Sequence, residues 1–101
     1  MTNKTLDQLT TLMNNFVRSK GWYEADSKRP QTPRNLAISL NLETSEVLEH
    51  FQWDEEFDPE HLAEELADVA LYLLQLADVS GIDLEKAILK KLEINASREW
   101  D

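Results

Sequence analysis

Residues 58–81 read DPEHLAEELADVALYLLQLADVSG, and this segment carries both ends and the interior of one long helix. Asp58 followed by Pro59 is a typical helix start, because aspartate caps free backbone N–H groups and proline fits the first helical position. Gly81 is a natural helix end. Between these signals apolar side chains fall almost all around the helix, which indicates burial among other helices. We therefore predict a helix from Pro59 until Gly81.

Three further helices are predicted around this one. Apolar residues at helical spacing indicate a helix over residues 5–20, which Gly21 would end. A threonine and a proline repeat the start signal before a helix that runs to about residue 52, over residues 33–52. A capping aspartate precedes the fourth helix, residues 84–98. The long segment 22–32 lacks periodicity and is predicted to be a loop.

The composition supports an all-α fold in one domain. With two glycines and three prolines among 101 residues, the chain has little material for the turns of an all-β fold, whereas good helix formers are plentiful. No internal repeat or flexible linker divides it. We therefore expect residues 1–101 to form a single domain, a four-helix antiparallel bundle with short connections.

The sequence also bears on the location of the protein. It contains no cysteine, which excludes disulfides, thiolate zinc sites and cysteine nucleophiles and fits a reducing cytoplasm. The first residues lack the basic and apolar pattern of a secretory signal, and the longest apolar run is interrupted by Asp68 and Gln75. We expect a cytoplasmic protein that does not span a membrane.

The net charge narrows the classes of partner. Twenty acidic against ten basic residues give a formal charge of −10, which argues against a groove that holds a nucleic-acid backbone through lysine and arginine. A phosphate-bearing substrate would be repelled as well, unless bound cations reversed the local sign of the charge. The acidic residues therefore have to be considered position by position.

Four of these acids form two matched pairs. Glu43 and Glu46 are three residues apart on the second helix, as are Glu65 and Asp68 on the third, so each pair shares one helix flank. Both pairs lie at the margin of an apolar arc and would converge if the two arcs packed together. Magnesium or manganese suits such an all-oxygen cluster and would relieve its repulsion. His50 lies one turn beyond Glu46 and is interpreted as a bystander.

Acid pairs at this spacing are also ordinary on solvated helix faces, so one isolated pair says little. Two matched pairs beside a buried helix favour a metal site, because charges near a buried helix need partners. The flanking residues then extend the pattern beyond the acids, in four segments: PRNL at 33–36, EVLEHFQW at 46–53, EELADV at 64–69 and K-x-x-x-N-x-x-R at 91–98.

Together these segments resemble the MazG-like all-α nucleotide pyrophosphohydrolases, and within them the dCTP pyrophosphatase branch. The acid motif is Glu-x-x-Glu followed, after an 18-residue gap, by Glu-x-x-Asp, and the likeness covers roughly residues 5–98. The resemblance implies a helical bundle assembled as a dimer or dimer of dimers. It also implies magnesium-dependent cleavage of a nucleoside triphosphate, here dCTP or a modified dCTP, to the monophosphate and pyrophosphate in nucleotide-pool housecleaning.

The resemblance also implies residue roles. The four carboxylates would hold magnesium, with manganese as a possible substitute, and carry the catalysis. Trp22 and Trp53 resemble the aromatics that sandwich the base, for which stacking is suited because every base has a π face. Tyr72 would reach the sugar or the phosphates. The triphosphate would be held by three residues on one stripe of the fourth helix: Lys91, Asn95 and Arg98.

One position departs from the branch, which usually has a histidine just before its Pro-Arg-Asn segment. Gln31 and Thr32 stand there instead, so the base preference is open. Gln31 could still hydrogen-bond a base edge. Each of the aromatic and basic residues also has a structural alternative, since tryptophans can cap a core and lysine or arginine can complement a helix C-terminus.

Two functional alternatives and one expectation about assembly complete the picture. The chain could act on dUTP or another non-standard nucleotide, or be a non-catalytic nucleotide-binding regulatory module. We expect a homodimer or homotetramer, because the third helix is too apolar for one small layer to cover. Leu71 and Leu74 lie opposite the acids and are predicted to face the second protomer.

Overall fold

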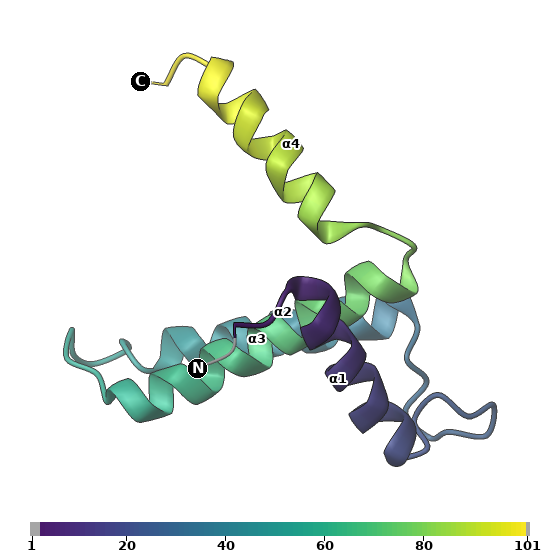
Figure 1. The fold of residues 1–101 in the computed structure, drawn as a ribbon. Helices are drawn as coiled ribbons and strands as arrows, with labels where there is room; N and C mark the ends of the chain where they lie inside the picture. The colour runs from purple at the N-terminus through teal and green to yellow at the C-terminus, as the bar shows by residue number, and fades with distance from the viewer. Residues whose placement is uncertain (1–2, 101) are drawn as a thin grey trace.

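The computed structural model describes residues 3–100 as an all-α chain with four helices (Figure 1). These are α1, Leu6–Ser19; α2, Pro33–Glu49; α3, Pro59–Val79; and α4, Leu84–Ser97. The predicted all-α class and the order of the four helices are confirmed. The second helix ends at Glu49, earlier than the expected residue 52, because residues 50–53 form turns and bends. Among the helices of residues 3–100, none combines the length and the hydropathy that a membrane span requires.

The helix starts follow the predicted capping chemistry. The side chains of Thr32 and Asp58 accept hydrogen bonds from backbone N–H groups at the starts of α2 and α3, and a proline follows each of them. Asp83 caps α4 in the same way. Gly21 and Gly81 have φ values of 73° and 70°, the left-handed conformation that glycine adopts without strain. The two glycines therefore let the chain turn sharply after α1 and α3.

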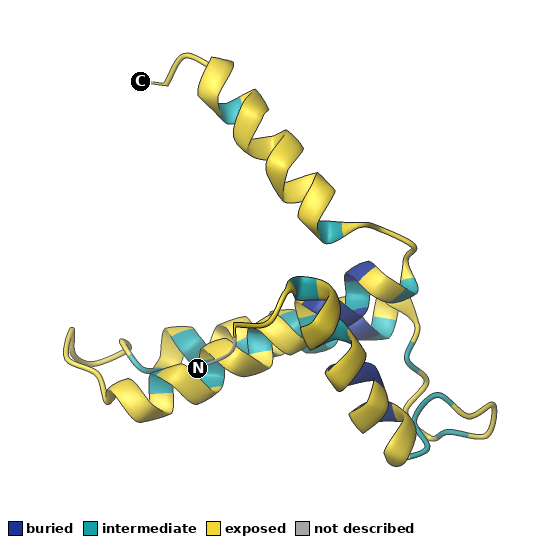
Figure 2. Cartoon of the chain, viewed as in Figure 1, coloured by how far each residue is buried: buried dark blue, intermediate teal, exposed yellow. Residues whose placement is uncertain are grey.

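The core is formed by α1, α2 and α3. Helices α2 and α3 lie side by side as an antiparallel hairpin, and α1 packs across α3 (Figure 1). The buried apolar side chains come from all three of these helices and lie where they meet (Figure 2): Met13, Val17, Leu36, Leu74 and Ala77. Burial of such side chains stabilises the fold by about 1.5–3 kcal/mol each for the larger ones.

Helix α4 does not join the other three, so the expected four-helix antiparallel bundle is wrong for the single chain. It leaves the end of α3 and projects away from it (Figures 1 and 2). None of its residues is buried. Four of its five large apolar side chains are 41–59% exposed: Ile88, Leu89, Leu92 and Ile94. The physical reason is the short turn at Ser80–Asp83, which directs α4 outward, where its own protomer offers little apolar surface.

The expectation for Leu74 is also wrong. Its side chain is 7% exposed and belongs to the core of its own protomer, because α1 covers that side of α3. Leu71, three residues earlier, is 44% exposed, but it lines the same groove as Asp68 rather than a surface opposite that acid.

Candidate functional site

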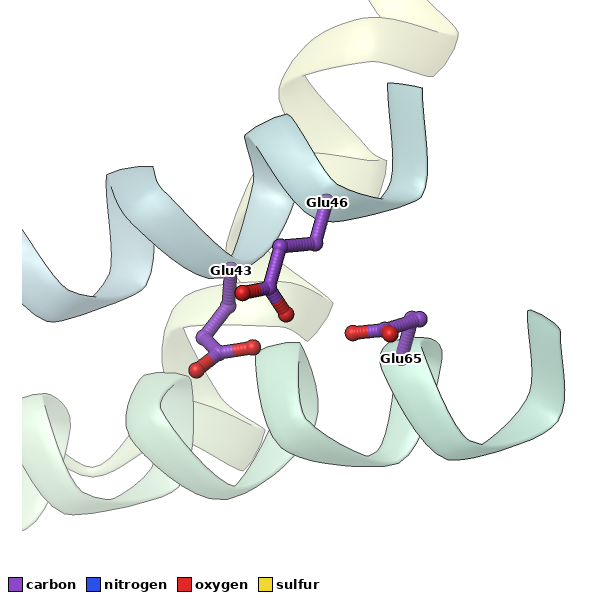
Figure 3. A group of neighbouring side chains, drawn as sticks. All are labelled: Glu43, Glu46 and Glu65. Atoms are coloured by element: carbon purple, nitrogen blue, oxygen red, sulfur yellow. The ribbon is translucent and has the colours of Figure 1, made fainter. Parts of the chain in front are cut away.

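Three of the four predicted metal ligands form a cluster between α2 and α3. Glu43 and Glu46 are one turn apart on α2, and Glu65 faces them from α3 (Figure 3). One carboxylate oxygen from each lies within 4.8 Å of the other two. The antiparallel hairpin produces this convergence, since it brings the later part of α2 beside the first half of α3.

The cluster is electrostatically unfavourable as it stands. Burial, a hydrogen bond with Glu46 and nearby negative charges raise the pKa of Glu43 from its ordinary 4.5 to about 7. The pKa of Glu65 is raised as well, first by its hydrogen bond with Glu46 and then by burial. Within residues 3–100 the only ion pair joins His61 to Asp58, so no lysine or arginine neutralises the three glutamates.

Two carboxylate oxygens without hydrogen-bond partners are suited to bind a cation. Oε2 of Glu43 and Oε2 of Glu65 are sealed from solvent, and neither has a hydrogen-bond partner in the described residues. A buried acceptor without a partner is destabilising. A divalent cation would satisfy both oxygens and offset the repulsion, and carboxylate oxygen is the donor that magnesium and manganese prefer.

This arrangement predicts how the stability of the metal-free protein depends on pH. Between about pH 4.5 and about pH 7 the native Glu43 binds more protons than the unfolded chain, so the free energy of unfolding should fall as pH rises through this window. Urea denaturation in a chelator should show a lower midpoint at about pH 7.5 than at about pH 5. Saturating magnesium should remove most of the difference.

The variant Glu43→Gln is the control for this measurement, because other acids in the chain also contribute to a pH dependence. Its urea midpoint should change less between the two pH values than that of the unaltered protein. Identical pH profiles for the two proteins would contradict the role assigned to this carboxylate.

Asp68, the fourth predicted ligand, lies one turn after Glu65 on α3 but outside the group of three. It is exposed and lines a groove of about 850 Å³ between α1, α2, α3 and the loop before α2. Its negative charge also contributes to the raised pKa of Glu43. Asp68 therefore joins the glutamate cluster to the groove.

The groove contains three of the predicted substrate-binding residues, namely Trp22, Gln31 and Tyr72. Trp22 packs edge-to-face on Phe16 at 5.8 Å between ring centroids, and the guanidinium of Arg29 lies 5.8 Å from the Trp22 ring. The groove thus combines an aromatic wall, cationic side chains from the loop and an acidic end. A nucleotide requires the same three features, since its base stacks, its phosphates attract cations and its metal needs oxygen ligands.

The other predicted binding residues are not brought to this groove in the single chain. Trp53 is 90% exposed in the loop after α2, whereas Trp22 precedes α2. The 17 residues of α2 separate the two loops by about 25 Å, and Figure 1 shows them at opposite ends of the hairpin. A base sandwich between these two rings is therefore impossible within one protomer.

Of the residues expected to hold the phosphates, Lys91 and Asn95 lie on α4 and Arg98 is its C-cap, and α4 projects away from α2 and α3, the helices that carry the glutamates (Figure 1). Arg98 stacks on Trp100, its guanidinium carbon 4.4 Å from the ring centroid. The Trp100 indole N–H donates to the backbone carbonyl of Asn95 at 2.9 Å. The Oδ1 atom of Asn95 is sealed and has no partner among the described residues, while Lys91 is exposed.

A buried polar group in the groove was missed by the sequence reasoning. Gln75 is 3% exposed, lines the groove and donates hydrogen bonds from Nε2 to Gln31 Oε1 at 2.7 Å and to the Tyr23 hydroxyl at 3.3 Å. Tyr23 donates in turn to Asn14. The available signal was the glutamine itself, a polar residue inside the apolar run of α3.

Comparison with known proteins identifies a matching family and several relatives of the chain. Residues 38–100 match the model of the MazG-like family. The human protein dCTP pyrophosphatase 1 is 34% identical over 104 aligned residues, which cover 93% of this chain and 58% of that protein. The bovine protein of the same name is 35% identical, over 93% of this chain and 59% of its own length. The chain thus spans less than two thirds of these relatives.

A solved structure supports the fold directly. The chain is similar to the crystal structure of a pyrophosphatase from Archaeoglobus fulgidus, with a TM-score of 0.73 and 35% sequence identity. The likeness covers 94% of this chain and 92% of that one. A Salmonella phage dATP/dGTP diphosphohydrolase is 47% identical over a shorter stretch of 38 residues, 38% of this chain and 13% of that protein.

Proposed function

Because the chain belongs to the MazG-like family, we propose that it is a nucleoside triphosphate pyrophosphohydrolase, releasing a monophosphate and pyrophosphate. One observation carries the proposal: orphaned glutamate oxygens lie between α2 and α3, and Asp68 links them to a groove with nucleotide-binding chemistry. The names of the mammalian and archaeal relatives agree with this activity.

Glu43, Glu46, Glu65 and Asp68 are the proposed ligands of magnesium, which manganese could replace. The bound ion would supply a water of lowered pKa and neutralise charge on the phosphates. The residues of the chain would do the positioning: the carboxylates would hold the metal, and Glu46, the exposed member of the cluster, would orient the attacking water. Trp22 and Tyr72 hold the nucleoside in the groove.

We propose dCTP or a modified dCTP as the substrate, following the relatives that match nearly the whole chain. Hydrolysis of such a nucleotide would serve the housecleaning of the nucleotide pool. The shorter match to a dATP/dGTP diphosphohydrolase keeps a different base as the second candidate.

We further propose that the site is completed by a second copy of the chain, in a homodimer or dimer of dimers. The exposed apolar side chains of α4 require a partner surface, and Leu66 and Leu73, which do not line the groove, provide exposed apolar surface on α3. A second protomer could also bring its Trp53 and its α4 to the groove, which the single chain cannot do. Symmetric association would complete two sites at once.

Product analysis tests the proposed reaction. Incubation with dCTP and magnesium should yield dCMP and pyrophosphate in equal amounts, and excess chelator should abolish both. Chromatography of the nucleotide together with a pyrophosphate assay measures the two products. Release of orthophosphate and dCDP, or equal turnover in chelator, would contradict the assignment. A regulatory nucleotide-binding module would instead bind dCTP with magnesium and release neither product.

A further inference from the structure

A chain of hydrogen bonds runs from the surface to the wall of the groove. Asp78 accepts from Asn14 Nδ2 at 2.9 Å, and Asn14 Oδ1 accepts from the Tyr23 hydroxyl at 2.6 Å. Gln75 Nε2 then donates to the Tyr23 oxygen at 3.3 Å. Asn14 and Gln75 are 8% and 3% exposed. The reaction proposed above uses none of Asp78, Asn14, Tyr23 or Gln75.

The direction of every bond in this chain follows from Asp78. A carboxylate only accepts hydrogen bonds, so Asn14 must turn its NH₂ group toward Asp78 and its oxygen toward Tyr23. Burial raises the pKa of Tyr23 above its ordinary 10.0, so its hydroxyl keeps the proton and donates it to Asn14. The Tyr23 oxygen can then only accept, which selects the NH₂ end of Gln75.

The same hydrogen bonds determine which atom of Gln75 remains free to bond a ligand in the groove. The second hydrogen of its Nε2 goes to Gln31 Oε1 at 2.7 Å, so both amide hydrogens are used. Within residues 3–100 its Oε1 receives no hydrogen bond, and this atom is not among the sealed, unpartnered oxygens. Gln75 lines the groove, and the one polar atom of its side chain that is left to bond a ligand there is this acceptor, held in one orientation.

We propose that Gln75 Oε1 selects a base with an exocyclic amino group, cytosine over uracil, and that Asp78, Asn14 and Tyr23 act as positioning residues for it. The inference rests on the proposed nucleotide hydrolysis. An exocyclic amino group would donate a hydrogen bond to this oxygen. The carbonyl of uracil in the same place would repel it, because both oxygens are hydrogen-bond acceptors. A site built around one fixed hydrogen bond discriminates more strongly than an apolar pocket does.

The test compares kcat/KM for dCTP and dUTP in the protein and in three variants. The unaltered protein should prefer dCTP by at least about tenfold, and Gln75→Met, which keeps the volume of the side chain, should lose most of this preference through a higher KM for dCTP. Asn14→Ala removes the link to Asp78 and lets the Tyr23 hydroxyl turn and donate toward Gln75, so the orientation of the Gln75 amide is held by Gln31 alone. It should therefore raise kcat/KM for dUTP while lowering that for dCTP.

A gain of activity on dUTP cannot come from a damaged fold, which makes Asn14→Ala the decisive variant. Asn15→Ala, at the exposed next position of α1, is the matched control and should leave the ratio unchanged. Equal kcat/KM for dCTP and dUTP in the unaltered protein would overturn the inference, and so would parallel losses on both nucleotides in Asn14→Ala and Gln75→Met.

A failure of the proposed reaction is distinguished by binding. If no triphosphate is hydrolysed, calorimetry with dCMP and dUMP still measures the preference of the groove. Tighter binding of dCMP, reduced by Gln75→Met, would support the inference, whereas equal binding of the two monophosphates would overturn it.

Discussion

Replacing Glu65 with glutamine is expected to reduce magnesium-dependent pyrophosphate release by about a thousandfold or more, while the helices remain folded. Glutamine keeps the shape of the side chain but removes the charge that faces Glu43 and Glu46 across the hairpin. A carboxamide is a poorer ligand for a hard cation. Steady-state kinetics over a range of magnesium concentrations measures the effect. Asp68→Asn should behave similarly.

Stability separates this effect from misfolding. The pKa of Glu65 is raised in the native state, so its charge opposes folding at neutral pH, and its removal should leave the metal-free protein no less stable. Glu64→Gln removes one charge at the preceding, exposed position of α3 and should retain nearly full activity. Near-normal turnover in Glu65→Gln, or an equal loss in Glu64→Gln, would show that the cluster does not carry the chemistry.

Mixing two inactive variants is expected to restore activity, if α4 serves the groove of the neighbouring protomer. Asp68→Asn disables the acidic part of a site, and Lys91→Ala disables the part on α4. Each site takes its acids from one protomer and α4 from the other. In a mixed dimer, one site therefore receives both altered residues, and the other receives only unaltered ones. With random pairing, refolded equimolar mixtures should reach about a quarter of normal activity, although each variant alone has little.

The same mixture distinguishes the arrangements of the site. If Lys91 acted on the acids of its own protomer, every site in a mixed dimer would carry one defect and no activity would return. A mixture of Lys91→Ala with Arg98→Ala, one change on α4 and one at its C-cap, is the matched control and should stay inactive. Sedimentation must show an oligomer in both mixtures, and an active monomer as the sole species would contradict the proposal.

The local elements could be predicted from the sequence because their signals are local. Thr32 and Asp58, each followed by a proline, define helix starts through their own capping bonds, and Gly81 marks an end through its left-handed backbone. The convergence of Glu43, Glu46 and Glu65 was also accessible, since two adjacent helices with matched acidic flanks have few ways to pack. The proposed roles of the aromatic and basic residues rest on the family resemblance.

The arrangement of the helices could not be predicted in the same way. The direction of α4 depends on the turn at Ser80–Asp83 and on any contact with another protomer. Its apolar pattern is the same whether its own protomer or another one covers it, so the sequence does not distinguish the two cases. The sequence does not show that Leu74 belongs to the core, because α3 is apolar on nearly every side and its pattern does not indicate which face α1 covers. The hydrogen bonds of Gln75 join residues up to 52 positions apart.

The closeness of the glutamates along the chain has a consequence for the order of folding. Glu43 and Glu65 belong to one helical hairpin, so they meet as soon as the loop between α2 and α3 closes. Contacts between near segments form early, because little chain entropy is lost in closing a short loop. The repulsion among the clustered glutamates then opposes formation of the α2–α3 hairpin, the part of the fold that forms first. Magnesium would act as a folding ligand for α2 and α3 before α1 closes the groove and before any partner arrives.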